Sequence, residues 1–464
     1  MDYIKEIEKQ DSLIIEKFSD IMHVDKNLSR KLVSFQANKD HSIYRWYKFK
    51  EAFSIDLINY LFNIYPFEEG RILDPFAGIG TTLFACSNLG FDALGIELLP
   101  IGNTVINAGL LARNGNTEKL TKVLHDWRKN KYWNNDGDIK DFKILNITKF
   151  AYPEITERKI KRYLFEIEKE EKNTRDFLLF VLLCILEDIS YTRKDGQYLR
   201  WDSRSERNRG SKHFIKRQIL SFDDAMTLKI SEIIEDLSCY QLNINFNTEI
   251  ACKKGEISLL QGSALKTLTS IDSETFTGLI TSPPYCNRYD YTRTYALELA
   301  LLGVGEEEIR QLRQSMLSCT VENKEKDLLS INSHWIEAIY ICDRNLLLQS
   351  ILKYLEYKRE YGELNNNGII QMVKGYFYEM ACIIQESYRV LKNNSYLLMV
   401  NDNVRFAGIS ISVDLILSMI AEEIGFKIEN ILVLPNGKGN SSQQMGKFGK
   451  DILRKCVYVW KKEK

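Results

Sequence analysis

A glycine-rich turn between a predicted strand and a predicted helix offers the first chemistry in this sequence. It reads Asp74-Pro75-Phe76-Ala77-Gly78-Ile79-Gly80-Thr81-Thr82. Glycines let a backbone turn tightly and approach a ligand closely, and the helix that follows has N–H groups available for a negatively charged group. Glu97 ends the next predicted strand, where a carboxylate can accept hydrogen bonds from both ribose hydroxyls. Together these features predict a nucleoside-type cofactor, although a glycine-rich turn alone is as often structural.

The second candidate follows the apolar run Gly278-Leu279-Ile280 and reads Thr281-Ser282-Pro283-Pro284-Tyr285. Two successive prolines hold the backbone rigid, so the Ser282 hydroxyl and the Pro283 carbonyl can be aimed as fixed acceptors. Tyr285 adds a flat face beside them. An exocyclic amine on a nucleobase donates two hydrogen bonds and stacks well, so it matches these groups. A plain proline turn is the alternative, but three of the chain's 7 prolines lie in these two motifs, which favours a functional role.

The pair of motifs resembles those of the S-adenosylmethionine-dependent DNA amino-methyltransferases, which modify cytosine at N4 or adenine at N6. The resemblance covers roughly residues 40 to 110 and 255 to 464, and most of the region between them has no match. It implies an α/β, Rossmann-like class I methyltransferase fold: a mostly parallel seven-stranded sheet with an antiparallel last strand, plus a large helical insertion. The insertion precedes the segment that begins at Gly262, which departs from the family pattern.

The resemblance also assigns roles to matching residues. The first motif would hold the methionine part of S-adenosyl-L-methionine, Glu97 its ribose, and the segment from Gly262 its adenine. Upstream, residues 36–39 and 44–54 take the place of a flanking cofactor motif. The residues expected to bind the cofactor are Lys50, Phe53, Asp74, Pro75, Phe76, Gly78, Gly80, Thr81, Thr82, Glu97, Leu98, Gly262, Ser263 and Ala264. The residues expected to be catalytic are Ser282, Pro283, Pro284 and Tyr285.

These groups suit methyl transfer to an amine whose lone pair is delocalised into a base. Hydrogen bonds from the amine to Ser282 and Pro283 would favour a more tetrahedral and more reactive nitrogen. A base inside a duplex cannot reach such a pocket, so the target nucleotide would be flipped out, with Tyr285 stacking on it. Residues 401–403 and Gly408 would border this pocket. The family pattern links Ser-Pro-Pro-Tyr to cytosine N4, although either acceptor could serve either amine.

The resemblance therefore predicts a site-specific DNA methyltransferase that favours cytosine N4, in a restriction–modification system with a separate restriction endonuclease. Three alternatives stay open: an adenine-N6 DNA methyltransferase, an RNA amino-methyltransferase, and a non-catalytic DNA-binding subunit with a degenerate fold. Intact Asp74, Glu97 and Ser282 to Tyr285 argue against the last of these.

Seven strands and several helices must position these motifs. Residues 1 to 30 alternate apolar and charged types at near-helical spacing and predict a helical lead-in. The predicted strands cover residues 71–76, 92–98, 257–261, 277–281, 395–400, 427–434 and 455–460, and the turn leads into a helix over 81–88. We expect three parts: residues 1–112 with the cofactor-binding part, a mostly helical insertion at 113–254 that recognises the target sequence, and residues 255–464 with a helical insert at about 303–365.

Basic residues gather in the expected insertion. Between Arg193 and Arg217 there are nine basic residues against three acids, which suits contacts with phosphates and guanine edges. The alternative is that this basic stretch is a solvated surface loop with no role in DNA binding. Arg288 and Arg293 lie beside the second motif, where they could hold phosphates or pair with Asp290 and Glu298. The residues expected to bind double-stranded DNA are Arg193, Arg200, Arg204, Arg207, Arg209, Arg288 and Arg293.

Composition bounds these interpretations. The chain has 464 residues with 63 basic and 63 acidic side chains, and 44% are hydrophobic, so it is a folded globular protein. Nine scattered cysteines without a Cys-x-x-Cys pair, and no membrane-length apolar run, fit a cytoplasmic protein without a metal site or a membrane partner. A second basic stretch from Lys438 to Lys464 could be solvated edge charge. Neutrality overall therefore allows DNA to be held on a local basic surface.

Overall fold

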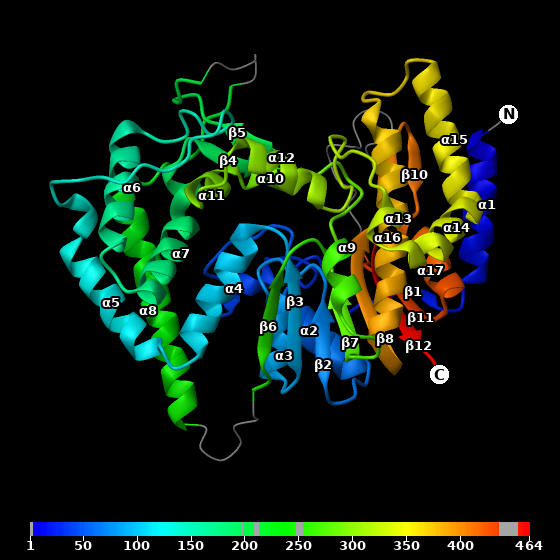
Figure 1. The fold of residues 1–464 in the computed structure, drawn as a ribbon, viewed down its shortest axis with the longest axis horizontal. Helices are drawn as coiled ribbons and strands as arrows, with labels where there is room; N and C mark the ends of the chain where they lie inside the picture. Colours follow the sequence, from blue (N-terminus) through cyan, green and yellow to red (C-terminus); the bar gives the residue numbers. More distant parts are fainter. Residues whose placement is uncertain (1–2, 196–197, 208–212, 247–253, 436–452) are drawn as a thin grey trace.

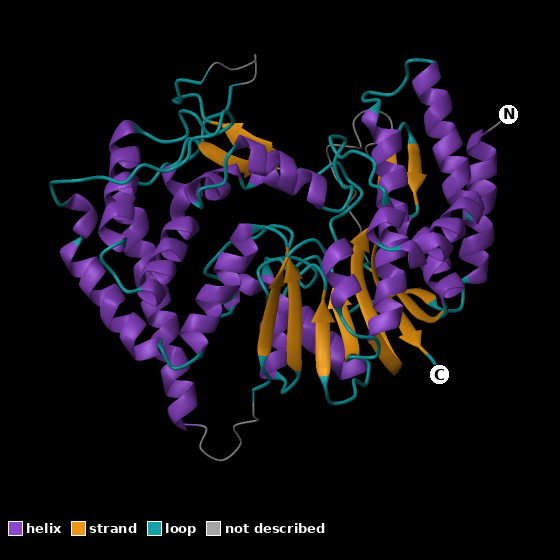
Figure 2. Ribbon diagram, viewed as in Figure 1, coloured by secondary structure: helices purple, strands orange, loops and turns teal. Residues whose placement is uncertain are grey.

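A twisted, mostly parallel β-sheet forms the centre of the protein (Figures 1 and 2). The computed structural model describes residues 3–195, 198–207, 213–246, 254–435 and 453–464. Within these residues the central sheet has eight strands. In their spatial order the strands are β1 (Met22–Val24), β11 (Phe426–Val433), β12 (Lys455–Lys462), β8 (Leu391–Asp402), β7 (Phe276–Thr281), β2 (Arg71–Asp74), β3 (Asp92–Glu97) and β6 (Ile257–Gln261).

The strand order confirms the predicted fold, but the predicted number of seven strands is wrong, because β1 adds an eighth strand within the described residues. From β2 the chain steps outward through β3 to β6, then returns to β7 on the other side of β2 and continues through β8. Only β12 runs antiparallel to both of its neighbours, as predicted for the last strand. The order reverses between β2 and β7, and in doubly wound sheets ligands bind outside the carboxyl ends of the strands at such a point. Both motifs follow these two strands.

The lead-in was only partly predicted. Helix α1 (Tyr3–Lys17) is present, but residues 22–24 form β1, which pairs in parallel with β11 at the edge of the sheet. A helix through residue 30 is therefore wrong. A strand this short is specified by its neighbour's free edge rather than by its own pattern, so periodicity could not reveal it.

Alternating side chains place two hydrophobic layers on the sheet. Ile72, Leu398 and Val400 face one side, where they pack with the first helices of the domain. Leu73 and Leu397 face the other side, beneath the C-terminal helices. The first set is α2 (Ile55–Ile64) and α3 (Thr81–Asn88). The second set, which α1 joins, is α9 (Ala264–Thr267), α13 (Leu328–Ile331), α14 (Ile336–Arg344), α15 (Leu346–Glu360), α16 (Gly368–Val390) and α17 (Val413–Ile424).

A second group of helices lies beside the sheet, at the left of Figure 1. It has its own hydrophobic core, built around Trp127, Tyr163 and Phe177. This core also takes in Trp46 and Leu299, from before and after the predicted insertion. The elements are α4 (Pro100–Arg113), α5 (Thr117–Asn130), α6 (Glu154–Ile167), α7 (Lys172–Ile189), α8 (Phe222–Phe246), α10 (Tyr291–Thr294), α11 (Ala296–Leu301) and α12 (Glu306–Ser315).

Two short antiparallel ribbons complete the described chain. Strands β4 (Thr192–Asp195) and β5 (Tyr198–Trp201) form one, and β9 (Val404–Phe406) and β10 (Ile409–Ile411) form the other. The first lies inside the basic stretch, so that part is a β-ribbon rather than a solvated loop. Within the described residues, no helix combines the length and apolar character needed to cross a membrane.

Candidate active site

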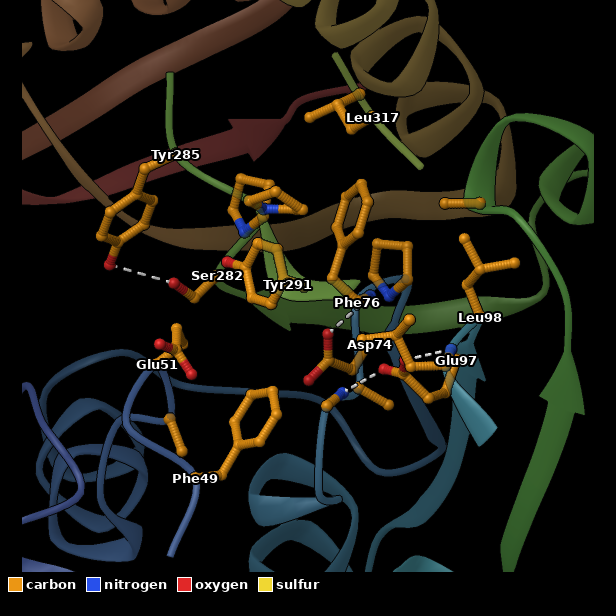
Figure 3. Close-up of a pocket in the computed structure, with 18 of the residues that line it drawn as sticks. Phe49, Glu51, Asp74, Phe76, Glu97, Leu98, Ser282, Tyr285, Tyr291 and Leu317 are labelled. Atoms are coloured by element: carbon orange, nitrogen blue, oxygen red, sulfur yellow. Dashed lines mark hydrogen bonds between the residues drawn. The ribbon is translucent and has the colours of Figure 1, made fainter. Parts of the chain in front are cut away.

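A cavity of about 650 Å³ opens at the carboxyl ends of β2, β3 and β7, where the strand order reverses (Figure 3). Its volume lies within the range of about 300–1,000 Å³ that is usual for small-molecule sites. Of the residues predicted to bind cofactor or to act in catalysis, all but Gly80 line it. Gly80 instead precedes α3, with φ of 83°. A Cβ at Gly80 would lie 2.8 Å from Ile106, so the helix start demands glycine there.

A hydrogen bond joins the two motifs. The Thr281 hydroxyl, at the end of β7, donates to Asp74 Oδ1 at 2.6 Å, and Asp74 Oδ1 also accepts from the Phe76 N–H at 3.1 Å. The Asp74 side chain is buried, and burial raises its pKa to about 6 even though these bonds favour the carboxylate. Adjacent parallel strands thus bring two segments that are 207 positions apart in the sequence to one wall.

Glu97 closes the glycine turn. Its two carboxylate oxygens accept hydrogen bonds from the backbone N–H groups of Gly78 and Leu99, each at 2.7 Å. Burial raises its pKa to about 7, against the opposing effect of these two N–H groups. Each carboxylate oxygen has a second lone pair, so two acceptor positions remain for ligand hydroxyls. The position agrees with the ribose contact that the sequence predicts.

Glu51 also lines the cavity, and sequence analysis placed it within the flanking motif at residues 44–54 without singling it out. The Tyr295 hydroxyl donates to its Oε2 at 2.5 Å, and burial raises the pKa of the Glu51 carboxyl. Tyr295 stacks on Phe49, another lining residue, with ring centroids 4.9 Å apart. In Figure 3 the Glu51 carboxylate is directed into the cavity from the side opposite Leu317. In the sequence, the feature that could have singled out Glu51 is that it is the one acidic residue between Phe49 and Phe53.

Lys50 lines the cavity as predicted. Its ammonium donates a hydrogen bond to the carbonyl of Lys194 in β4. Burial lowers the pKa of Lys50. Phe53 lines the cavity and packs in the hydrophobic layer with α2 and α3. The lysine therefore ties the cavity wall to the basic ribbon.

Ser282 lines the cavity. Its Oγ lies 3.1 Å from the carbonyl oxygen of Val400 and 3.2 Å from the Tyr285 hydroxyl. A carbonyl only accepts, so a bond to Val400 uses the Ser282 proton. One serine lone pair can then accept from the Tyr285 hydroxyl, and the other stays available to an amine. The arrangement can therefore act as a hydrogen-bond acceptor for an exocyclic amino group.

Two further charged residues line the same end of the cavity. Lys455, the first residue of β12, and Asp402, the last residue of β8, form an ion pair of 2.9 Å. Lys455 Nζ is also 3.3 Å from the Tyr285 hydroxyl. Asp402 belongs to the segment predicted to border the target pocket. Lys455 comes from the second basic stretch, and it lines the cavity instead of being a solvated edge charge.

The predicted DNA-binding arginines of the basic stretch from Arg193 to Arg217 are mostly engaged within the protein. Arg193 and Arg200 both pair with Asp195, at 3.2 and 3.1 Å. Arg204 makes two bonds of 2.8 Å to Asp202. Arg207 donates to two backbone carbonyls and lies over the Trp201 ring. Arg209 lies outside the described residues.

The two arginines after the second motif differ from each other. Arg293 pairs with Asp290 and Glu322, so the expected partner Asp290 is confirmed, while Glu298 pairs with Lys194 instead. Arg288 is half-buried with φ of 65°, and its Nε has no hydrogen-bond partner among the described residues. One Arg288 nitrogen lies 3.4 Å from Asn365 Oδ1. An arginine without a carboxylate beside it is available for a phosphate.

Comparisons with known proteins identify relatives of this chain by sequence. A family model described as DNA methylase matches residues 9–100. The chain is 56% identical to the type II methyltransferase M.AvaI of Nostoc sp. over 99% of its own length and 95% of that protein. It is 41% identical to the type II methyltransferase M.BsoBI of Geobacillus stearothermophilus, over 97% of this chain and 91% of that protein. The type II methyltransferase M.MjaII of Methanocaldococcus jannaschii matches 38% of the chain at 25% identity.

Proposed function

This chain belongs to the DNA methylases, and from that premise we propose that it is a type II DNA methyltransferase that modifies cytosine at N4. The assignment as a type II DNA methyltransferase is supported by sequence identities of 56% and 41% to two type II methyltransferases over nearly the full length of the chain. A cognate restriction endonuclease that cuts the same DNA sequence is the partner this class implies. The Ser282 hydroxyl and its setting support cytosine N4 as the target.

S-adenosylmethionine is the methyl donor of this family, and the residues present fit it. Glu97 keeps acceptor positions for two ribose hydroxyls, and Phe76 and Leu98 supply apolar contact beside them. Buried carboxylates at Asp74 and Glu51 suit a ligand that carries positive charge. When bound, the cofactor supplies an electrophilic methyl group.

The protein's own contribution to the reaction is to hold the target amine. Ser282 Oγ and the Pro283 carbonyl accept hydrogen bonds from the two N–H groups of the amine. These hydrogen bonds favour a nitrogen lone pair directed toward the methyl donor. Position matters most, because a fixed near-attack geometry removes much of the entropic barrier. The cavity that Ser282 shares with the cofactor residues is the observation that carries this proposal.

The choice of cytosine rests on the family pattern that links Ser-Pro-Pro-Tyr to N4. The Ser282 hydroxyl can donate to Val400 while one of its lone pairs accepts from the amine, so a neutral serine suffices as acceptor. Adenine N6 is the alternative target, and analysis of the methylated nucleosides separates it from cytosine N4.

Unmethylated bacterial DNA is incubated with the protein and labelled S-adenosylmethionine, and its nucleosides are analysed by mass spectrometry. We expect N4-methylcytosine, and sequencing of the product maps the recognised site. Ser282→Ala is expected to lower kcat by about a hundredfold. Ser270→Ala, an exposed serine that bonds only within its own turn, is the matched control. Detection of N6-methyladenine would exclude cytosine N4 as the target. If no methyl group were transferred to DNA, the proposed methyltransferase activity itself would be excluded.

Double-stranded DNA is the proposed substrate, held on basic residues beside the cavity. Helix α10 packs beside β5, so the ribbon with Arg193 and Arg200 lies next to the loop that carries Arg288. Recognition of the target sequence by the helical group at residues 113–254 is part of this proposal.

A further inference from the structure

Four polar groups form a continuous chain along one wall of the cavity. Ser282 Oγ lies 3.2 Å from the Tyr285 hydroxyl, which lies 3.3 Å from Lys455 Nζ, which lies 2.9 Å from Asp402 Oδ1. All four residues line the cavity. This series of polar contacts connects Ser282, the group proposed to accept the amine, to the Lys455 ammonium.

The Lys455 ammonium has a hydrogen-bond donor to spare. An ammonium carries three N–H bonds, and the described residues supply two acceptors, Asp402 and Tyr285. Burial opposes the charge, but Asp402 and Tyr285 outweigh burial and raise the pKa of Lys455. A charged donor therefore faces the cavity throughout the neutral pH range.

The Watson–Crick edge of cytosine matches this order of groups. From the amine outward, cytosine presents a donor, the ring acceptor N3 and the carbonyl acceptor O2. Adenine presents a donor, one ring acceptor and then a C–H group. A pocket with acceptors for the amine and a cationic donor next to them is complementary to cytosine, and it offers adenine less.

We propose that Lys455 is a specificity-determining residue that donates a hydrogen bond to the N3–O2 edge of the flipped cytosine, held in place by Asp402. This inference rests on the proposed cytosine-N4 function and adds the residue that reads the base. The Lys455 ammonium also lies 5.1 Å from the centroid of the Tyr285 ring, which fixes that ring from one side. Because Ser282 and Lys455 both lie within 3.3 Å of the Tyr285 hydroxyl, one base can reach both.

A purely structural ion pair is the competing explanation. Lys455 and Asp402 are direct neighbours in the antiparallel pairing of β12 with β8, and such pairs stabilise sheets. Loss of activity in a Lys455 variant would not distinguish a structural role from a base-reading role. The two roles differ in whether the variant changes the effect on kcat/KM of replacing single atoms of the target base.

The test is a double-mutant cycle between protein and base. Duplexes with the mapped site carry cytosine, 3-deazacytosine or 2-thiocytosine at the target position, and kcat/KM is measured for the wild type and for Lys455→Met. We expect the wild type to lose about tenfold or more with at least one analogue, as for a hydrogen bond to a charged group. In Lys455→Met that penalty should shrink to about twofold or less.

Lys461→Met is the matched control, because Lys461 lies on the same strand, is absent from the cavity lining and should keep the full penalty. Cofactor affinity by calorimetry verifies that each variant is folded. If Lys455→Met does not fold, the double variant Lys455→Met with Asp402→Leu, which removes both charges of the ion pair, takes its place. An unchanged penalty in the Lys455 variant, or no penalty in the wild type, overturns the role of Lys455 while leaving N4 methylation intact. A product of N6-methyladenine instead overturns the proposed function itself.

Discussion

Lys194 of the β4–β5 ribbon and Glu298 of α11 form a buried ion pair, with side-chain exposures of 4% and 1%. The Tyr47 hydroxyl also donates to Glu298, at 3.0 Å, and the Lys194 ammonium lies over the Tyr295 ring. Tyr295 in turn bonds to Glu51 in the cavity wall. One lysine therefore connects the basic ribbon to the wall of the active site.

Breaking this pair from one side should destabilise the protein. Lys194→Met leaves the Glu298 carboxylate buried without its cation, and removal of one partner from a buried pair typically costs about 3–5 kcal/mol. We expect the midpoint of urea unfolding to fall accordingly. The double change Lys194→Met with Glu298→Leu removes both charges and should recover much of the loss.

The control for this prediction is an exposed pair. Lys122 and Glu118 form an ion pair one turn apart on α5, with side-chain exposures of 75% and 73%. Lys122→Met should change the free energy of unfolding by about 0.5 kcal/mol or less. Equal effects of Lys194→Met and Lys122→Met would contradict a structural role for the buried pair.

Cofactor binding should weaken as the pH falls below 7. Burial raises the pKa of Glu97 to about 7, and only its ionised form accepts hydrogen bonds from both ribose hydroxyls. Bound cofactor therefore favours the carboxylate and releases a proton. Calorimetry between pH 8 and pH 6 should show affinity falling by up to about tenfold per unit, with an enthalpy that depends on the buffer.

Glu97→Gln should bind the cofactor weakly at every pH and with a smaller slope. Exposed Glu118, changed to Gln, should leave both affinity and slope as in the wild type. A flat pH profile in the wild type would contradict the assignment of Glu97.

The same carboxyl sets a pH dependence of stability without cofactor. The pKa of Glu97 rises from 4.5 to about 7 on folding, so between these values the folded state binds more protons than the unfolded state. Stability from this group is therefore present below about pH 4.5 and is lost as the pH rises to about 7. Thermal unfolding should show this loss in the wild type, and Glu97→Gln should remove its share of it.

The sequence predicts those parts of the fold that depend on local patterns. Strand β6 and helix α3 have the predicted bounds, because each is a short apolar or small-residue run between turn residues. The two motifs are contiguous in sequence, so each could be recognised as a unit. Their meeting through Thr281 and Asp74 follows from parallel strands that end at the same edge.

Contacts between distant segments could not be predicted in this way. Lys455 reaches the cavity only because β12 pairs antiparallel with β8 in a register that sets it opposite Asp402. The β4–β5 ribbon was hidden by its charge, since a buried Lys194 looks like a solvated residue until Glu298 is placed beside it. In both cases tertiary pairing overrides the local pattern.

Gly102 in α4 should be needed for the geometry of the cofactor site. A Cβ there would lie 2.2 Å from the Gly78 carbonyl oxygen and 2.6 Å from Glu97 Cγ. Gly102→Ala must therefore displace the turn or the carboxylate, at a cost of about 1–3 kcal/mol. We expect a weaker cofactor complex by calorimetry, about tenfold or more. Gly115→Ala is also strained, because φ there is 81°, but a Cβ would meet open space and Gly115 does not line the cavity, so cofactor affinity should stay unchanged. Equal affinity in both variants would refute the prediction.

Arg288 should contribute more to DNA binding than Arg204. Arg204 is held by two hydrogen bonds to Asp202, whereas Arg288 has a buried Nε without a partner among the described residues and no carboxylate within ion-pair distance there. Arg288→Ala should weaken DNA binding and lower the slope of log affinity against log salt by about 1. Arg204→Ala should leave that slope unchanged, because its charge is already compensated. Fluorescence anisotropy with labelled duplex at several salt concentrations measures both. A loss of slope in Arg204→Ala alone would assign the phosphate contact to Arg204 instead.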